Sequence, residues 1–209
     1  MNAKSEAKSK FNKKLLAIPL IILVIVAVVV SWQIYWQSSN VTKSNVTLPA
    51  LNLTLVGANG QQKVLNSREL AALKSYTANG GYSEGGMTCN VCGTIYLGNY
   101  TGVPILTLLD LVGGITSSEK VNVTGSDGYQ VTFTYQQVHG QGLTTFDPTT
   151  GATVQASQPL KMIVAYYCNG TSLASGQGPL SVAFVGPQGL VTPGNYWAYL
   201  VVKIEIFKA

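Results

Sequence analysis

Hydrophobic residues follow two different patterns along the chain. Between residues 15 and 36 they form a nearly continuous run that no charged residue interrupts. From residue 51 onward they occur in short runs, which alternate with polar residues and are separated by Gly, Asn and Pro. A continuous run of about 20 apolar residues is long enough to cross a bilayer as a helix, whereas short alternating runs indicate half-buried strands. The pattern therefore predicts an anchor helix of residues 15–36 and a strand-rich domain of residues 51–209.

The alternating runs of the domain predict a series of β-strands. Asn59-Gly60 separates the first two runs, and this dipeptide accepts the positive φ angles of a tight hairpin turn. The stretch of residues 79–86 is rich in glycine and predicts a loop. Strands are predicted over residues 51–56, 63–65, 94–97, 121–124, 129–135, 160–167, 180–185 and 197–207.

Two short helices are predicted among these strands. Residues 68–73 form the first, capped by Asn66 or Ser67. Residues 105–112 form the second, which Pro104 opens and the following glycines end. Strands outnumber helices, so the predicted fold class is α+β, mostly β, preceded by one transmembrane helix.

The positive charge of the chain is concentrated in its N-terminal tail. The whole chain has 13 Lys and Arg against 8 Asp and Glu, but residues 1–14 alone hold five of the lysines and one glutamate. The remaining residues carry 8 basic and 7 acidic groups, a net charge of +1. They lack the cluster of cationic side chains that neutralises phosphates, so nucleic acid is excluded as a partner. Lysines on the near side of residues 15–36 predict a cytoplasmic N-terminus.

An uncleaved anchor explains residues 15–36 better than a cleaved signal peptide. A signal peptide has an apolar stretch of about 7–15 residues and a small-x-small cleavage site. Here the apolar stretch is longer and ends in Ser-Trp-Gln-Ile-Tyr-Trp at residues 31–36, whose aromatic rings favour the headgroup layer. We therefore expect a single-pass protein of the cell membrane. Residues 15–36 would contact lipid, residues 37–50 would form a polar linker, and residues 51–209 would lie outside the cell.

Potential glycosylation sites agree with an extracellular location. The sequence contains several Asn-x-Ser/Thr sequons, which are glycosylated on the surfaces of exported proteins. The chain is also poor in charge, with 10% charged residues against about 25% in an average soluble domain. We expect a surface solvated by amides, hydroxyls and glycans, as on an archaeal-type cell surface. The sequon asparagines are Asn40, Asn45, Asn52, Asn99, Asn122 and Asn169.

Five short motifs carry a resemblance to a known family. They are Tyr100-Thr101-Gly102-Val103-Pro104, Ser126-Asp127-Gly128-Tyr129, Ala165-Tyr166-Tyr167-Cys168-Asn169-Gly170, Gly178-Pro179-Leu180, and Trp197 before the terminal strand. In this order they resemble the molybdopterin-binding oxidoreductase domain of the sulfite oxidase type. The resemblance implies a mostly β fold and molybdopterin as a cofactor. It also implies a cysteine ligand to molybdenum upstream of the Tyr-Thr-Gly segment, for which Cys89 is the best-spaced candidate.

Most of the residues that would anchor this cofactor are missing. The family usually shows His-Gly-x-Pro-x-Arg before the strand that starts at Leu180, but here Gly176 replaces the histidine and Ser181 the arginine. The phosphate of the pyranopterin needs cationic and hydrogen-bonding groups, while the domain offers only Arg68, His139 and scattered lysines. We therefore expect an inherited fold without the cofactor, acting as a binding, assembly or envelope module. The alternatives are a molybdenum-dependent oxidoreductase that uses Cys89, or an accessory subunit of a membrane complex.

The three cysteines allow three interpretations. Cysteines outside the cell are oxidised by default, so the first is a structural disulfide from Cys168 to Cys89 or Cys92. The second is a redox-active dithiol within Cys89-Asn90-Val91-Cys92. The third is a metal site in which His139 joins the thiolates as a ligand. A haem attachment site is excluded, because Gly93 stands where that motif requires histidine.

Other polar residues with chemical potential are interpreted as structural. Asp127 and Asp147 lie in sequences typical of turns. His139 precedes a glycine-rich stretch without an acidic neighbour and is interpreted as a loop residue. Neither a Ser-His-Asp set nor a phosphate-binding loop can be assembled from the sequence.

Overall fold

The computed structural model describes residues 48–88 and 91–209, with the side chains of residues 85–88 and 91–92 left out. The predicted tail, the predicted anchor and most of the predicted linker lie outside the described residues, as do Asn40, Asn45 and Cys89. Among the residues described, no helix combines the length and the hydrophobicity that a membrane crossing requires.

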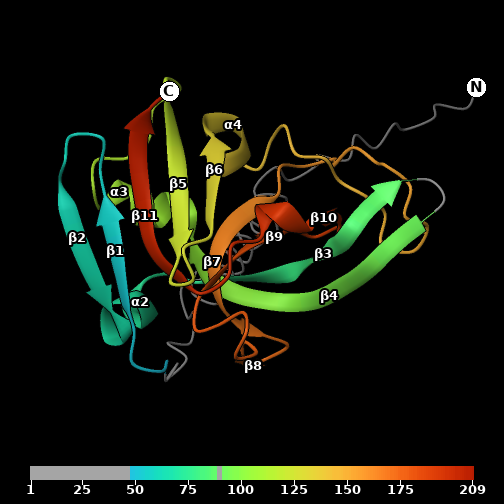
Figure 1. Cartoon of the computed structure of the whole chain (residues 1–209), viewed down its shortest axis with the longest axis horizontal. Helices are drawn as coiled ribbons and strands as arrows, with labels where there is room; N and C mark the ends of the chain where they lie inside the picture. Colours follow the sequence, from blue (N-terminus) through green and yellow to red (C-terminus); the bar gives the residue numbers. More distant parts are fainter. Residues whose placement is uncertain (1–47, 89–90) are drawn as a thin grey trace, which may run out of the picture. The chain divides into compact units, whose positions relative to one another are not determined.

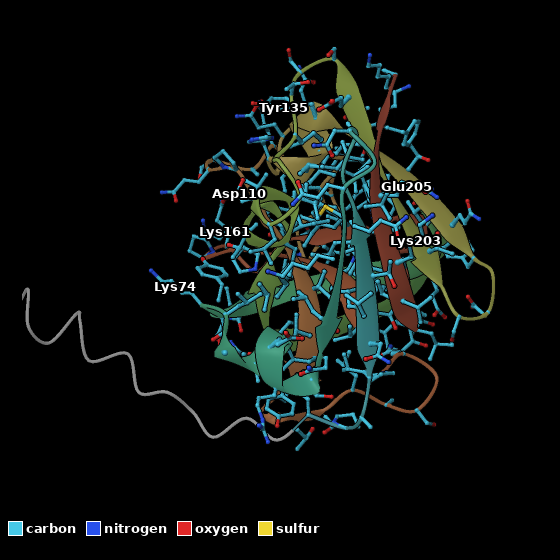
Figure 2. All side chains as sticks on the ribbon, turned by 90° about the vertical axis from the view of Figure 1, so that its left-hand side faces the viewer. Lys74, Asp110, Tyr135, Lys161, Lys203 and Glu205 are labelled. Carbon is cyan, nitrogen blue, oxygen red and sulfur yellow. The ribbon has the colours of Figure 1, made fainter. Side chains whose placement is uncertain are left out.

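One sheet of the domain has five strands. They are β2 (Gln62–Asn66), β1 (Asn52–Val56), β11 (Val201–Lys208), β5 (Glu119–Gly125) and β6 (Gln130–Thr134), in this spatial order. Strand β11 pairs in parallel with β1 and antiparallel with β5, so the first and last strands of the domain are neighbours (Figure 1). On the face of β11 that points away from the core, Lys203 and Glu205 form an ion pair of 2.7 Å (Figure 2).

The second sheet has six strands, four of which close into a ring. Its strands are β3 (Tyr76–Thr88), β4 (Val91–Pro104), β7 (Lys161–Cys168), β8 (Thr171–Ser172), β9 (Ser181–Val185) and β10 (Val191–Pro193). Strand β3 pairs with β4, β4 with β7, β7 with β9, and β9 again with β3 at the Gly80–Val185 pair. The long hairpin of β3 and β4 extends beyond this ring, with β10 beside it (Figure 1).

Within residues 48–88 and 91–209, three short α-helices and one 3-10 turn connect the strands: α2 (Ser67–Ala72), α3 (Ile105–Asp110), α4 (Tyr135–Val138) and η1 (Gly194–Tyr196). The first begins as predicted, because the Asn66 side chain accepts from the backbone of Arg68 and Glu69 while the Glu69 carboxylate accepts from the backbone of Asn66. Pro104 precedes α3, also as predicted. Helix α4 was not predicted; a second capping box between Thr134 and Gln137 ends the strand one residue early and starts a helical turn.

The apolar core lies between the two sheets. It joins side chains of β1, β5 and β11 to side chains of α3, β7 and β9, and the Phe133 and Phe184 rings, 5.8 Å apart, link the two sides. Strand β7 is buried on both faces: Met162 and Val164 face this core, while Ile163 and Ala165 face a second cluster. That double burial explains the uninterrupted apolar run that predicted the strand.

The α+β, mostly β prediction is confirmed, with two corrections to its elements. The glycine-rich stretch 79–86, predicted as a loop, lies inside β3. The last strand begins at Val201 rather than Trp197, because η1 and the segment after it occupy residues 194–200. Both of these segments lie where the backbone packs closely around a group of aromatic rings.

Candidate functional site

Five aromatic side chains gather where the family motifs meet in space. We define the aromatic cluster as Tyr82, Tyr96, Tyr100, Trp197 and Tyr199. Tyr82 and Tyr96 are cross-strand partners on β3 and β4, and Tyr100 lies four residues further along β4. Trp197 and Tyr199 come from the segment between η1 and β11. The sequence motifs include Tyr100 and Trp197, but they do not predict that these five rings meet.

The motifs reach the cluster from separate parts of the chain. Tyr100 and Trp197, from the first and last motifs, are 5.1 Å apart between ring centroids. Gln177, just before the Gly178-Pro179-Leu180 motif, donates from Nε2 to the Tyr82 hydroxyl at 2.9 Å. The Tyr129 hydroxyl, from the Ser-Asp-Gly-Tyr turn, donates to the Asn195 carbonyl at 3.3 Å. Motifs that lie far apart in the sequence thus meet at one place in the fold.

The rings of the cluster run from the surface into the interior. Tyr96 is 40% exposed, whereas Tyr82, Tyr100 and Trp197 are buried. The Tyr82 ring stacks on Tyr96 at 4.8 Å with an interplanar angle of 17°, and its centroid lies 4.9 Å from that of Trp197. Tyr199 meets Tyr82 edge-on at 6.0 Å. Small and branched side chains of β7 and β9, including Ala165 and Val185, form the floor.

The polar atoms of the cluster are held by hydrogen bonds. Trp197 donates from Nε1 to Thr192 Oγ1 at 2.8 Å, and both residues are buried. Burial raises the pKa of Tyr82, Tyr100 and Tyr199, so these phenols are neutral at neutral pH. Ser83 Oγ, by contrast, is buried without a partner among the described residues.

Cys168 borders the cluster beside Tyr100. The two residues are opposite each other on β7 and β4. Both side chains lie over Gly98: a Cβ at that position would stand 2.5 Å from Cys168 Sγ and 3.0 Å from Tyr100 Cε2. Burial raises the pKa of the Cys168 thiol. A glycine at residue 98 therefore makes room for the contact between sulfur and ring.

The described residues do not contain the predicted disulfide of Cys168. Its thiol is free, and its ladder partner is Tyr100, eight residues along β4 from Cys92. At about 3.3 Å per residue that is roughly 26 Å, far beyond the Cα separation of about 4.4–6.8 Å that a disulfide spans. In this register Cys168 lies far from Cys92, so the pairing with Cys92 is not formed in the structure and stays a prediction. The pairing with Cys89 stays a prediction, because Cys89 lies outside the described residues.

The other predicted site residues lie apart from the cluster. Arg68 is an exposed residue of α2. His139 caps the end of α4, where its Nδ1 pairs with the Tyr135 carbonyl at 2.8 Å and its ring lies 4.1 Å from the ring of Tyr135. In the part of the chain that the structure describes, no three His, Cys, Asp or Glu side chains are grouped as a metal site. Asp127 and Asp147 accept backbone N–H groups within their turns, as predicted.

The described sequon asparagines differ in how freely they project. Asn52 is exposed on β1. Asn122 donates from Nδ2 to Gln130 Oε1 at 3.0 Å. Asn99 donates from Nδ2 to Asn79 Oδ1 at 2.9 Å, and Asn169 Oδ1 accepts from the Asn99 backbone at 2.9 Å. Glycosylation at any of these positions stays a prediction, with Asn52 the least restrained by neighbouring side chains.

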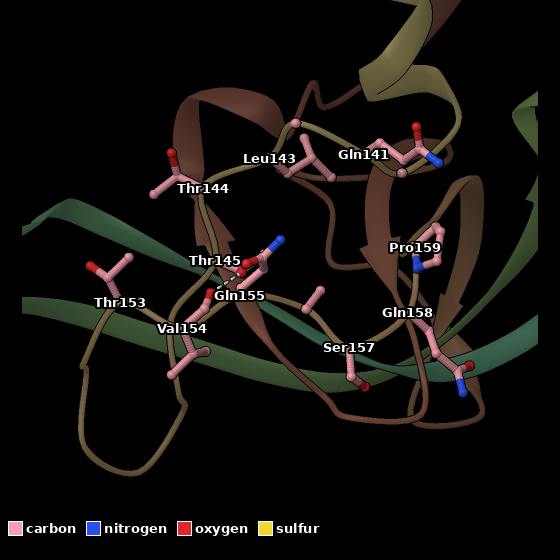
Figure 3. Close-up of a pocket in the computed structure, with 13 residues that line it drawn as sticks. Gln141, Leu143, Thr144, Thr145, Thr153, Val154, Gln155, Ser157, Gln158 and Pro159 are labelled. Carbon is pink, nitrogen blue, oxygen red and sulfur yellow. Dashed lines mark hydrogen bonds between the residues drawn. The ribbon is translucent and has the colours of Figure 1, made fainter.

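A separate cavity of about 520 Å³ is lined by residues 140–145 and 153–159 (Figure 3). Its polar lining consists of amides and hydroxyls, among them Gln141, Thr144, Gln155 and Ser157, without a charged side chain. It offers hydrogen bonds to a neutral ligand, but no cation for a phosphate.

Molybdopterin does not fit the described residues at the place where the motifs meet. Aromatic rings in mutual contact fill that space, and the charged group that contacts them is the Glu84 carboxylate, 3.5 Å from the Tyr96 hydroxyl. In this described part of the chain, no hydrogen bond or ring contact of the cluster involves Lys, Arg or His. Ser181, at the family's arginine position, is buried and donates to the Ala198 carbonyl at 3.2 Å. A phosphate there would be desolvated without a countercharge.

Comparisons with known proteins identify the fold. No family model matches the sequence, and no curated protein matches it. Among solved structures, the crystal structure of the sulfane dehydrogenase SoxCD from Paracoccus pantotrophus is similar, with a TM-score of 0.54 and 18% sequence identity. The match covers 76% of this chain and 38% of that chain, so the chain spans less than half of its neighbour's length. This likeness supports the molybdopterin-oxidoreductase type of fold that the motifs predict.

Proposed function

We propose that this chain is a single-pass membrane protein whose extracellular domain uses an oxidoreductase fold as a binding, assembly or envelope module, without catalysis at molybdenum. The aromatic cluster is the observation that carries the proposal. Rings of Tyr82, Tyr100 and Trp197 fill the place where the family motifs meet, and Ser181 provides no cation there. The fold is retained while the chemistry that holds the cofactor is not, and function follows from the site rather than from the fold.

The membrane topology of the proposal is supported by the sequence of the first 36 residues. Lysines precede the apolar run of residues 15–36, and Trp and Tyr residues end it. We expect the full chain to stay in the membrane pellet after carbonate extraction, with the domain accessible to protease from outside intact cells. Release by carbonate, or a mature chain that begins beyond residue 36, would contradict the anchor.

Metal analysis tests the non-catalytic proposal directly. We expect the full chain, purified from its native membrane, to contain molybdenum far below one atom per chain and to release no fluorescent pterin on oxidation. Stoichiometric molybdenum with pterin would overturn the proposal.

A molybdenum-dependent oxidoreductase is the second candidate, favoured by the likeness to a dehydrogenase structure. Cys89 would be its metal ligand. If molybdenum is found, Cys89→Ser should abolish it while Cys92→Ser should not; loss in both variants or in neither would reject Cys89 as the ligand. An accessory subunit of a membrane complex is a form of the first proposal, and pull-down from detergent extracts would then recover the same partner subunits in stoichiometric amounts.

A further inference from the structure

Four rings of the aromatic cluster form an unbroken line of contacts that ends beside a thiol. Tyr96 at the surface stacks on Tyr82 at 4.8 Å, Tyr82 meets Trp197 at 4.9 Å, and Trp197 meets Tyr100 at 5.1 Å. Tyr100 lies opposite Cys168 in the pairing of β4 with β7, and its ring and the Cys168 sulfur lie together over Gly98. Each member of this line is a tyrosine, a tryptophan or a cysteine, the side chains that lose one electron most readily.

We propose that this line carries single oxidising equivalents from Tyr96 at the surface to Cys168. The inference is independent of the proposed function, since it requires neither molybdenum nor a membrane anchor. It takes Cys168 as the free thiol of the structure, in place of the disulfide to Cys89 that the sequence predicts.

Two features distinguish a relay from ordinary packing. Phenylalanine would fill the same volume, yet the line contains only phenols and an indole, and their polar atoms are held by Gln177 and Thr192. At the entrance, the Tyr96 hydroxyl donates to the Glu84 carboxylate at 3.5 Å. A tyrosine that loses an electron becomes a strong acid, so this carboxylate is placed to take the proton and return it afterwards.

The electron and proton balance of the relay is simple. A one-electron oxidant, such as an outer-sphere metal complex, takes an electron from Tyr96, and the proton moves to Glu84. Tyr96 is restored by an electron passed from Tyr82, and Trp197 and Tyr100 pass electrons in turn. In the net reaction the S–H bond of Cys168 breaks: its electron reaches the oxidant and its proton leaves to solvent from the half-buried thiol. The product is a thiyl radical at Cys168, and all four rings end unchanged.

Photo-oxidation with a spin trap tests the relay. The full chain in detergent is illuminated with ruthenium tris(bipyridine) and persulfate, which generate the ruthenium(III) oxidant, in the presence of a nitrone. The measured quantity is the fraction of Cys168 peptide that carries the nitrone adduct. We expect Tyr96→Phe and Trp197→Phe each to lower that fraction severalfold, because phenylalanine resists one-electron oxidation.

The controls separate the relay from direct attack on the thiol. Tyr129→Phe removes another exposed tyrosine, 44% exposed and outside the line, and should leave the adduct fraction unchanged. Equal adduct at Cys168 in the wild type, Tyr96→Phe and Trp197→Phe would overturn the proposal. Trp197→Phe loses a buried hydrogen bond, so its melting temperature is measured first. Tyr96→Phe alters only a surface ring, and this variant decides the outcome if Trp197→Phe is unfolded.

Discussion

Gly80 is the residue at which the second sheet closes into a ring. It pairs with Val185 across β3 and β9, and a Cβ at this position would stand 2.3 Å from the Phe184 carbonyl oxygen. No L-side chain fits there unless one strand moves. The glycine-rich stretch that looked like a loop is thus a strand whose glycines allow backbones to approach.

Replacing Gly80 should therefore destabilise the domain. We expect Gly80→Ala to cost about 1–3 kcal/mol of unfolding free energy, the range for forced overpacking. Gly176→Ala is the matched control, because no heavy atom lies within 4 Å of its added Cβ. Chemical denaturation of both variants measures the difference. A Gly80→Ala midpoint equal to that of the control would mean that the ring closure tolerates a side chain.

At the scale of elements, the start of a helix could be predicted from its capping residues. Asn66 predicted the start of α2, and the structure shows both hydrogen bonds of its capping box. The same signal at Thr134 and Gln137 does not predict a helix, because the alternating run of β6 continues up to it. The pairing of β9 with β3 could not be predicted, since it depends on contacts between residues about 100 positions apart in the sequence.

The cap of α2 gives a prediction at this scale. We expect Asn66→Ala to cost about 1 kcal/mol of unfolding free energy, because it leaves the backbone N–H groups of Arg68 and Glu69 without their acceptor. Asn66→Ser retains an acceptor at the N-cap and should recover most of that loss. Thermal denaturation of the two variants side by side measures the loss of stability in each. A serine variant as unstable as the alanine variant would show that Asn66 does not stabilise the helix by accepting hydrogen bonds at its N-cap.

For the whole molecule, the sequence predicted which motifs belong together but not what fills the space between them. Tyr100 and Trp197 were identified through the family motifs, whereas Tyr82 and Tyr96 lie in segments without a recognisable motif. Their meeting depends on the register of β3 against β4, which pairs Tyr82 with Tyr96. A periodic pattern gives the face on which a residue lies, but not the register that brings two distant rings into contact.

The buried tyrosines make the stability of the whole domain depend on pH at its alkaline end. Burial raises the pKa of Tyr82, Tyr100, Tyr166 and Tyr199 above the usual value of about 10. The unfolded chain then loses protons near pH 10 while the folded chain keeps them, so folding stability is fully present below that pH and falls as the pH rises above it. Because four groups contribute, the loss should be cooperative and steep.

Absorbance of tyrosinate at alkaline pH, followed together with circular dichroism, measures this coupling. We expect the tyrosinate signal of the buried groups to appear only as the secondary structure is lost. Tyr166→Phe removes one of the titrating groups while leaving the line from Tyr96 to Cys168 intact, so its unfolding should take up one hydroxide ion fewer and begin at a higher pH. If the buried tyrosines titrate before the fold is lost, solvent reaches them in the native state and the core around Trp197 is less closed than its contacts indicate.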